Sequence, residues 1–311
     1  MKHAFVAGAS GGIGFALVQE LVKRGVHVTA FARGEEKLRH LYQEMKNVTI
    51  KVGDILNQKD LIEAVEGADT LFHAIGFPYE KWANTHLPCM KKMIEAAKRN
   101  EARIVLADNI YAYGIQGDRP VDELAKKIPH TKKGKLRLEM EKTLLLSSVP
   151  ALIAHLPDLY GPNAENTLLH ETLNGAINKK KANYIGCPKK KREFLYTRDA
   201  AEAVVRLAED HTCFNQNWNI ASKPINGHAL LQLISKQTNH SKGYRIVKRR
   251  MIRTLGLFSP FMREMVEMMY LTEQPVLLDG TKAANKLGKL PYTPFEEGIA
   301  ETVSWMKSRA M

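Results

Sequence analysis

The chain has 311 residues, and its 46 lysines and arginines exceed its 33 aspartates and glutamates, which gives a formal net charge of +13. Hydrophobic residues make up 44% and charged residues 25%, a balance that is typical of globular proteins and excludes a disordered or fibrous chain. The three cysteines (Cys89, Cys187 and Cys213) are far apart, and no apolar run has transmembrane length. We therefore expect a cytoplasmic protein with no membrane partner.

Short apolar runs of strand length alternate with helical patterns through the first half of the chain. The strand-like runs are residues 4–7, 26–31, 48–52, 70–75, 103–107 and 151–154. Helical periodicity follows at residues 13–21, 90–97 and 136–144. Runs that are apolar throughout, without alternation, suit a parallel sheet with both faces covered. The predicted fold is therefore α/β, a doubly wound parallel sheet of Rossmann type.

The second half is less regular. One further strand is predicted at 218–220, within a segment that returns to the sheet. The predicted division is a Rossmann domain at residues 1–158 and 193–222, and a smaller, mostly helical substrate lobe at residues 159–192 and 223–311.

A glycine-rich turn directly after the first predicted strand is the most specific motif. It reads Gly8-Ala9-Ser10-Gly11-Gly12-Ile13-Gly14, with the spacing Gly-x-x-Gly-x-x-Gly, and it opens the first predicted helix. Glycines let the backbone approach a pyrophosphate, whose charge is met by the helix N-terminus. We predict dinucleotide binding at Gly8, Ser10, Gly11, Gly12, Ile13 and Gly14, with a plain strand–helix turn as the alternative.

The end of the second predicted strand indicates which dinucleotide binds. No acidic residue stands at its tip, and Arg33 follows it directly. Because a guanidinium can pair with a 2′-phosphate, NADP(H) is preferred. Glu35 and Glu36 follow closely and keep NAD(H) open as the alternative.

Two more strand ends supply candidate cofactor contacts. Asp54 follows the third predicted strand and either accepts a hydrogen bond from the adenine amino group or serves only as a helix-entry turn residue. Ala74 and Gly76 follow the fourth, where small residues leave room for the cofactor ribose.

These motifs resemble the extended short-chain dehydrogenase/reductase family, the NAD(P)-dependent epimerase/dehydratase group, over essentially the whole chain. Further elements that carry the resemblance are Tyr113-Gly114, Lys135 with Glu139, and residues 156–162 and 192–199. The resemblance implies hydride transfer between NADP(H) and a carbonyl or hydroxyl of a small substrate, with a nucleotide sugar as one class.

The resemblance also implies roles for single residues. Lys135 and Pro157 would contact the cofactor, Tyr113 would contact the substrate, and Arg192 would bind an anionic group of the substrate. Related enzymes pair through two helices, here about 85–100 and 132–148, so a homodimer is implied, although lysines crowd the second helix.

The catalytic residues depart from the family pattern. The family has a Tyr four residues before the Lys, where this chain has Thr131, and a Ser or Thr four residues before Tyr113, where it has Asn109. An alkyl hydroxyl is far less acidic than a phenol, so Thr131 does not replace that Tyr. The remaining candidates are Asn109 to orient the substrate and Tyr111 or Lys135 to handle the proton.

Because the usual residues are missing, a catalytically silent NADP(H)-binding redox sensor or assembly factor is the alternative function. His73 is expected to be a core histidine, and His130, His155 and His170 lack metal-ligand spacing, so no metal is assigned. The basic runs carry neither an aromatic-rich strand nor a recognition helix, and nucleic acid is not expected as a partner.

Overall fold

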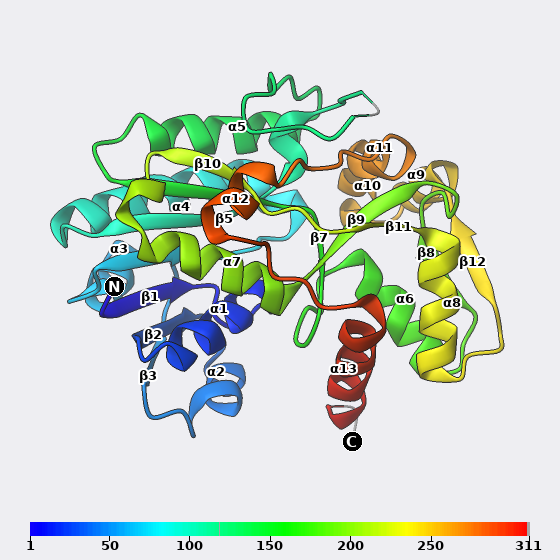
Figure 1. The fold of residues 1–311 in the computed structure, drawn as a ribbon, viewed down its shortest axis with the longest axis horizontal. Coiled ribbons are helices and arrows are strands. Elements are labelled where there is room, and N and C mark those ends of the chain that lie inside the picture. Colours follow the sequence, from blue (N-terminus) through cyan, green and yellow to red (C-terminus); the bar gives the residue numbers. More distant parts are fainter. Residues whose placement is uncertain (118, 310–311) are drawn as a thin grey trace.

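Seven parallel strands form the central sheet of the computed structural model, in the order β10-β6-β5-β4-β1-β2-β3 (Figure 1). They are β1 (His3–Ala7), β2 (His27–Ala32), β3 (Val48–Val52), β4 (Thr70–His73), β5 (Arg103–Asn109), β6 (Ala151–Leu156) and β10 (Gln216–Asn219). The order reverses between β1 and β4, which is the point where open α/β sheets bind their ligands. All the predicted strands are confirmed, including the late strand at 218–220, which begins two residues earlier as β10.

Helices cover both faces of this sheet because its strands are apolar on both sides. In β1, Ala4 and Val6 belong to one core, and Phe5 and Ala7 belong to the other. The first core is closed by α1 (Gly12–Lys23), α2 (Glu35–Tyr42) and α7 (Thr197–Glu209), the second by α3 (Gln58–Val65), α4 (Trp82–Arg99) and α5 (Lys132–Leu145). The doubly wound Rossmann fold is therefore confirmed.

Two of these helices were not predicted. The helices α2 and α3 have eight residues each and bury only two and three of them, so their apolar stripes are too short to detect by periodicity. The predicted dimer helices, α4 and α5, pack against each other over the second core, and the dimer itself stays a prediction.

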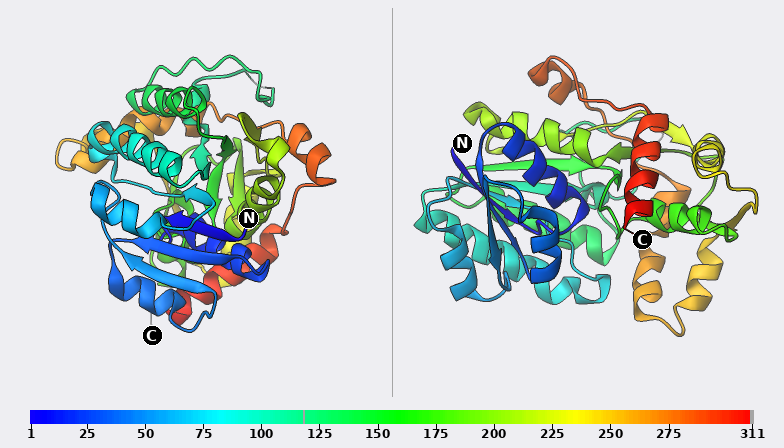
Figure 2. Two further views of the ribbon diagram at one scale, coloured as in Figure 1. Left: turned by 90° about the vertical axis from the view of Figure 1, so that its left-hand side faces the viewer. Right: turned by 90° about the horizontal axis from the view of Figure 1, so that it is seen from below.

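A second group of elements lies beyond the carboxyl ends of the sheet strands (Figures 1 and 2). Its strands are β7 (Asp158–Tyr160), β8 (Ala182–Ile185), β9 (Lys191–Tyr196), β11 (Pro224–Asn226) and β12 (Tyr244–Val247). Its helices are α6 (Leu168–Ile177), α8 (Gly227–Thr238), α9 (Arg249–Leu255), α10 (Pro260–Val266), α11 (Tyr270–Glu273) and α13 (Phe295–Ser308). The helix α12 (Thr281–Leu287) instead packs against α7 and β10 and joins the first core. The 3₁₀ turns η1 (Tyr79–Lys81), η2 (Ile110–Tyr113), η3 (His211–Cys213) and η4 (Glu267–Met269) complete the chain.

This group is mostly helical, as predicted, although the short strands β7, β8, β11 and β12 were not predicted. The strand β9 pairs with β7 and β11 and stays outside the central sheet, whereas α7 and β10 join it. The division into two domains remains a prediction. The structure describes residues 1–117 and 119–309, and residues 118, 310 and 311, which the predicted ranges include, lie outside it. In that described part, no helix is both long and apolar enough to cross a membrane.

A buried carboxyl group joins β9 to the segment before α12. Glu193 is 4% exposed, and its Oε2 accepts a hydrogen bond of 3.0 Å from the Leu278 N–H. Burial raises the pKa of Glu193 from 4.5 to about 8, and the two backbone donors beside it only partly oppose this shift.

This carboxyl group should make the folded state less stable as the pH rises. The folded chain keeps the proton until about pH 8, whereas the unfolded chain releases it near pH 4.5. The free energy of unfolding then falls between these values by up to about 1.4 kcal/mol per pH unit. Glu193→Gln keeps an acceptor oxygen but cannot ionise. Its melting temperature should therefore fall less than that of the wild type between pH 5 and 8. The exposed Glu44→Gln serves as control, and equal slopes in both variants would contradict the assignment.

Candidate functional site

The glycine-rich turn between β1 and α1 has no room for side chains at three positions. A Cβ on Gly8, whose φ is +85°, would lie 2.6 Å from the Ala74 carbonyl oxygen, and one on Gly14 would lie 2.1 Å from the Gly8 oxygen. A Cβ on Gly12 would lie 2.7 Å from the Cα of Ala164. The helix α1 begins after Gly11, which supplies no side-chain cap to the first N–H groups of the helix.

Three neighbouring segments hold this turn in place. The Gly8 and Ala9 N–H groups both donate to the Phe31 oxygen at the end of β2, at 3.0 and 3.2 Å. The buried Tyr42 hydroxyl donates to the Ala9 oxygen at 2.6 Å, and Asn163 Nδ2 donates to the Ser10 oxygen at 3.1 Å. A tightly packed glycine turn that leads into an α1 N-terminus without a side-chain cap fits the pyrophosphate of a dinucleotide. Sequence reasoning missed Tyr42 and Asn163, which no local motif marks.

The charged residues that follow β2 and β3 differ in whether they already have a partner within the protein. Arg33 follows β2 directly and is exposed, and among residues 1–117 and 119–309 it has no ion-pair partner. Of the two alternative acids, Glu35 is paired with Arg39 at 2.7 Å along α2, whereas Glu36 is exposed. Asp54 Oδ1 accepts from the Leu56 N–H at 3.0 Å in an exposed turn, so Asp54 serves the entry to α3.

The residues after β4 and β6 border the same edge of the sheet. The Ala74 N–H continues the pairing with β1 by donating to the Ala7 oxygen at 3.0 Å, and Gly76 has open space around it. Pro157 is buried between β6 and β7. These placements leave the predicted ribose contacts on the ligand side of the sheet.

At the end of β5, the structure brings Asn109 and Tyr111 together, and adds Tyr79. Asn109 Oδ1 accepts from the Tyr111 N–H at 3.0 Å and so caps η2. The Tyr111 hydroxyl lies 2.8 Å from the Tyr79 hydroxyl, and its ring stacks on Trp82 with centroids 6.0 Å apart. Burial raises the pKa of both phenols, so each stays protonated at neutral pH. Tyr79 was not predicted, because it lies in η1, 32 residues before its partner.

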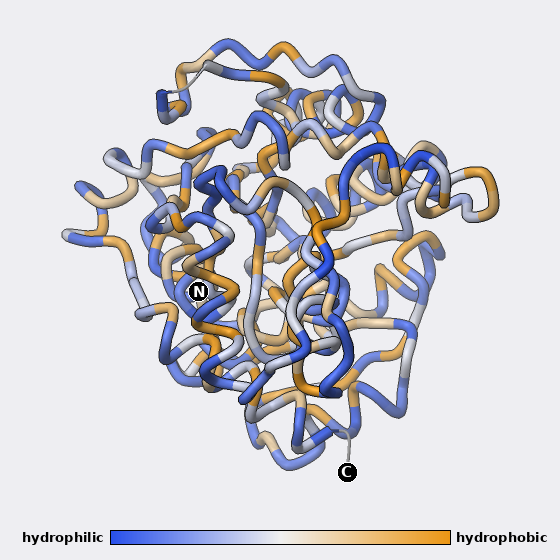
Figure 3. Tube along the Cα trace, turned by 90° about the vertical axis from the view of Figure 1, so that its right-hand side faces the viewer, coloured by the Kyte–Doolittle hydropathy of each residue, from blue (hydrophilic) through white to orange (hydrophobic). Residues whose placement is uncertain are grey.

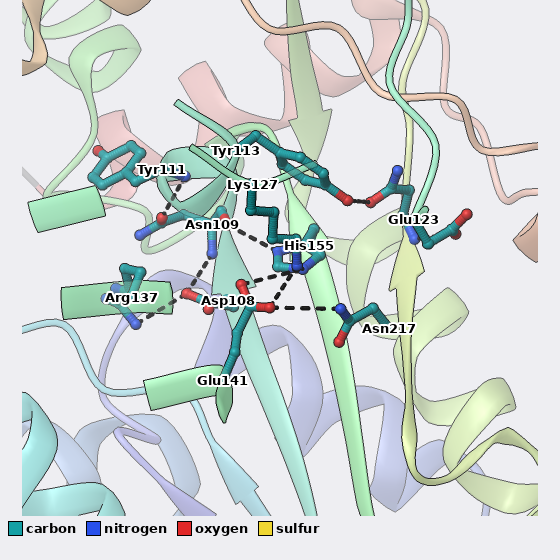
Figure 4. A network of polar contacts seen from close by, with 11 residues as sticks. Asp108, Asn109, Tyr111, Tyr113, Glu123, Lys127, Arg137, Glu141, His155 and Asn217 are labelled. Carbon is teal, nitrogen blue, oxygen red and sulfur yellow. Dashed lines mark hydrogen bonds and ion pairs between the residues drawn. The ribbon is translucent and has the colours of Figure 1, made fainter. Parts of the chain in front are cut away.

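The prediction that Tyr113 contacts substrate is wrong. Tyr113 is fully buried and points away from Tyr111, and its hydroxyl donates to Asn219 Oδ1 at 2.7 Å (Figure 4). Residues two apart in a 3₁₀ turn are separated by about 120° around its axis, and in η2 this directs Tyr113 to Asn219 while Tyr111 meets Tyr79.

The prediction that Arg192 binds a substrate anion is also corrected. Its guanidinium is buried and is already ion-paired with Asp158. It also donates to the Ile185 oxygen at 3.1 Å and lies 5.0 Å from the Phe194 ring centroid. The pairing of β7 with β9 places Asp158 opposite Phe194 and beside the Arg192 side chain, so this positive charge is neutralised within the fold.

On α5, the residues that face inward are two positions away from those that the sequence predicted. Thr131 is the N-cap of the helix, with Oγ1 accepting from the Gly134 N–H at 3.0 Å, and Lys135 is exposed. The buried charged residues are Lys133, Arg137 and Glu141. Their spacing of four residues is that of the family's Tyr, Lys and Glu, and Lys135 is turned about 200° from Lys133 around the helix. The structure therefore does not bring Lys135 to Asn109 and Tyr111.

The two cations of this buried face connect β5 with the lobe. Arg137 Nη1 lies 3.1 Å from Asp108 Oδ1, and its guanidinium lies 4.5 Å from the Trp82 ring centroid. Lys133 Nζ lies 2.5 Å from Glu264 Oε2 and 2.8 Å from Glu267 Oε1. Lys133 Nζ is also 5.0 Å from the Tyr79 ring centroid, so a fixed positive charge stands beside the tyrosine pair.

A third buried cation lies behind the site (Figure 4). Lys127 Nζ donates to Glu141 Oε2 at 2.5 Å and lies 2.8 Å from His155 Nε2. Possible ligand atoms of Asp108, Glu141 and His155 all lie within 4.8 Å of one another, as a metal site would require. The ammonium group of Lys127 already supplies a cation to two of them. Burial raises the pKa of Glu141 to about 7 and lowers that of His155 well below its usual value.

His73 lies in the core, as predicted. It is buried in β4, and its Nε2 lies 3.6 Å from the Cys89 sulfur. Burial lowers its pKa to about 3, so the ring is neutral and structural.

Comparisons with known proteins agree with this geometry. Residues 8–143 match the family model described as NAD(P)H-binding. A UDP-N-acetyl-alpha-D-glucosaminuronate decarboxylase from Bacillus cytotoxicus is 25% identical over 98% of both chains. A 2-alkyl-3-oxoalkanoate reductase from Shewanella oneidensis is 42% identical over 73 residues, which are 24% of this chain and 18% of that protein's length.

Solved structures share the fold over nearly the whole chain. The dTDP-glucose 4,6-dehydratase of Bacillus anthracis, in complex with NAD, matches 99% of this chain and 97% of its own with a TM-score of 0.82 at 15% identity. The UDP-glucuronic acid 4-epimerase of Bacillus cereus, with UDP-glucuronic acid and NAD, matches 99% and 100% with a TM-score of 0.80 at 20% identity. The chain therefore has the fold of the NAD-dependent epimerases and dehydratases, the extended short-chain dehydrogenase/reductase architecture, as the sequence predicted.

Gly14→Ala should open the glycine-rich turn. The added Cβ would lie 2.1 Å from the Gly8 oxygen, so the turn or α1 must shift. We expect a loss of about 1–3 kcal/mol of unfolding free energy and a loss of NADPH binding. Thermal melting and a fluorescence titration with NADPH measure both effects. Gly117→Ala, where a Cβ meets nothing within 4 Å, is the control, and full NADPH binding by Gly14→Ala would contradict this cofactor site.

Proposed function

We propose that this protein is an NADP(H)-dependent oxidoreductase of the epimerase/dehydratase type. It would transfer hydride between NADP(H) and a carbonyl or hydroxyl group of a small substrate. The observation that carries this proposal is the glycine cradle of α1, with Arg33 exposed and without an ion-pair partner in the described residues at the end of β2. The three cysteines are all free and lie far apart in the sequence, which supports a cytoplasmic location for the protein.

Each end of the cofactor would be held by residues of this chain. The N–H groups at the start of α1 would bind the pyrophosphate, and Arg33 would pair with the 2′-phosphate. Asp54 would lie at the adenine end, and Ala74, Gly76 and Pro157 would border the ribose of the nicotinamide. The cofactor supplies the hydride chemistry when bound.

Tyr111 is the residue best placed to handle the proton. Its phenol is kept neutral by burial, and it can donate to an oxyanion that develops on the substrate while Tyr79 donates a hydrogen bond to Tyr111. The Arg137 guanidinium, which opposes the rise in pKa of both phenols, would stabilise the charge left on the pair. Asn109 Nδ2 would orient the same substrate oxygen. The exposed Lys135 takes no part.

Two substrate classes follow from the relatives. The solved structures named above carry UDP-glucuronic acid or are named for dTDP-glucose, which favours a nucleotide sugar, an anionic substrate. The reductase from Shewanella oneidensis is named for a 2-alkyl-3-oxoalkanoate, an acid with an alkyl chain. Following NADPH oxidation against both classes and against simple aldehydes and ketones distinguishes them.

Arg33→Ala should weaken NADPH binding selectively. Losing a charge-assisted contact to the 2′-phosphate costs about 10- to 100-fold in affinity, and NADH, which lacks that phosphate, should be unaffected. Calorimetry with both cofactors measures this difference. The exposed Lys46→Ala is the control for general charge effects. Wild-type protein that binds NADH more tightly than NADPH would overturn the cofactor assignment.

Tyr111→Phe should reduce turnover by about 100-fold or more, because it removes the proton donor. Tyr79→Phe should have a smaller effect, about tenfold, because it removes only the supporting hydroxyl. Tyr113→Phe is the matched control, since its hydroxyl is buried against Asn219 and should affect stability only. Lys135→Ala should retain full turnover. A loss in Lys135→Ala with none in Tyr111→Phe would reverse this assignment.

The alternative is a catalytically silent NADP(H)-binding redox sensor or assembly factor. Two observations favour it: Thr131 serves only as a helix cap, and Lys133 is neutralised by two glutamates. Tight NADPH binding without turnover of any substrate class in the panel would support this alternative.

A further inference from the structure

A short helical hairpin projects from the lobe and carries apolar side chains at its tip. It consists of α9, the turn after it and α10, residues 249–266, and Figure 2 shows it extending away from the other elements. Phe258 is 86% exposed and Leu257 is 71% exposed, and both lie in the turn. Leu255, Met251 and Phe261 beside them are also exposed. Figure 3 shows the outermost turn of this projection as hydrophobic.

The base of the hairpin is firmly attached to the protein. Ile252 and Met265 belong to a buried cluster, and Lys133 binds Glu264 and Glu267 at this base. The Phe261 ring stacks on Tyr79 with centroids 5.7 Å apart. The apolar tip is therefore held out on an ordered support, and an exposed apolar patch on a fixed support marks an interaction surface.

The charge around the tip is of one sign. Residues 248–263 contain five cations and no acidic residue, and the cations are Lys248, Arg249, Arg250, Arg253 and Arg263. All five are exposed, and Arg249 alone among them lies within 4 Å of a carboxylate, that of Glu273 at 3.8 Å, in the described part of the chain. A second copy of this hairpin would be repelled by the first, and nucleic acid would leave Leu257 and Phe258 in water.

We infer that the α9–α10 hairpin docks on the surface of a bilayer that contains anionic phospholipids. The seven residues of α9 rise about 10 Å, so Leu257 and Phe258 would enter the acyl boundary while the arginines at the start of α9 stay at headgroup level. Apolar insertion and attraction to acidic headgroups together give reversible surface binding. The chain has no apolar run of transmembrane length, but a hairpin that lies on a bilayer surface does not need one.

This inference is independent of the proposed reaction. It rests on exposure and charge in residues 248–263 and on no property of the cofactor site. The hairpin base adjoins the tyrosine pair through Phe261, so docking would bring that end of the site toward the membrane surface.

The test is flotation of the full chain with vesicles of phosphatidylcholine, with and without phosphatidylglycerol. We expect binding to the mixed vesicles that weakens with salt and is much lower on phosphatidylcholine alone. The double substitution Leu257→Asp with Phe258→Asp should reduce binding by at least about tenfold. Arg250→Ser with Arg253→Ser should also reduce it by at least about tenfold, and only at low salt.

Two matched variants make the result specific. Leu124→Asp and Leu146→Asp alter side chains that are 92% and 86% exposed elsewhere, and they should bind vesicles like the wild type. The hairpin variants should keep the wild-type melting temperature and NADPH affinity, which shows that they are folded. Absence of wild-type binding to mixed vesicles at low salt would overturn the inference. So would equal binding by the tip and control variants, or a dimer in light scattering that only the tip variants abolish.

Discussion

The arrangement of this protein around its candidate active site depends on the pairing of charges buried on one face of α5. A charged side chain that leaves water without a partner costs several kcal/mol, so Lys133, Arg137 and Glu141 each require an opposite charge. Arg137 is met by Asp108 from β5, and Glu141 is met by Lys127 from the loop before the helix. Lys133 is met by two glutamates of the lobe. The position of α5 therefore determines how the end of β5 and the lobe lie relative to each other.

The fold could be predicted because its signals are local. The apolar strands and the glycine turn are contiguous in sequence, and the turn tolerates so few residue types that its spacing alone is specific. The catalytic side could not be predicted in the same way. A spacing of four residues occurs in two registers on α5, at 131/135/139 and at 133/137/141, and only packing decides which register faces inward. The availability of Tyr113 and Arg192 likewise depends on Asn219 and Asp158, which lie 106 and 34 residues away.

The excess of positive charge falls into two classes with different physical roles. Lys127, Lys133, Arg137 and Arg192 are buried, and each lies beside a carboxylate, so they contribute to structure and little to the external field. The exposed cations of residues 248–263 have few acidic neighbours, and they act on the surroundings of the protein. The net charge of the chain alone therefore does not indicate where a partner binds. The positions of the cations that have no acidic neighbour do.

The loop after β7 has a consequence for the order of events in a catalytic cycle. Asn163 donates to the Ser10 oxygen, and the backbone of Ala164 lies where a side chain at Gly12 would be, so a segment leading into the lobe rests on the phosphate-binding turn. A dinucleotide that bound in this turn would have to share it with that loop, and α6 begins only a few residues later, at Leu168. Cofactor would then enter first and complete the substrate lobe, and it would leave last.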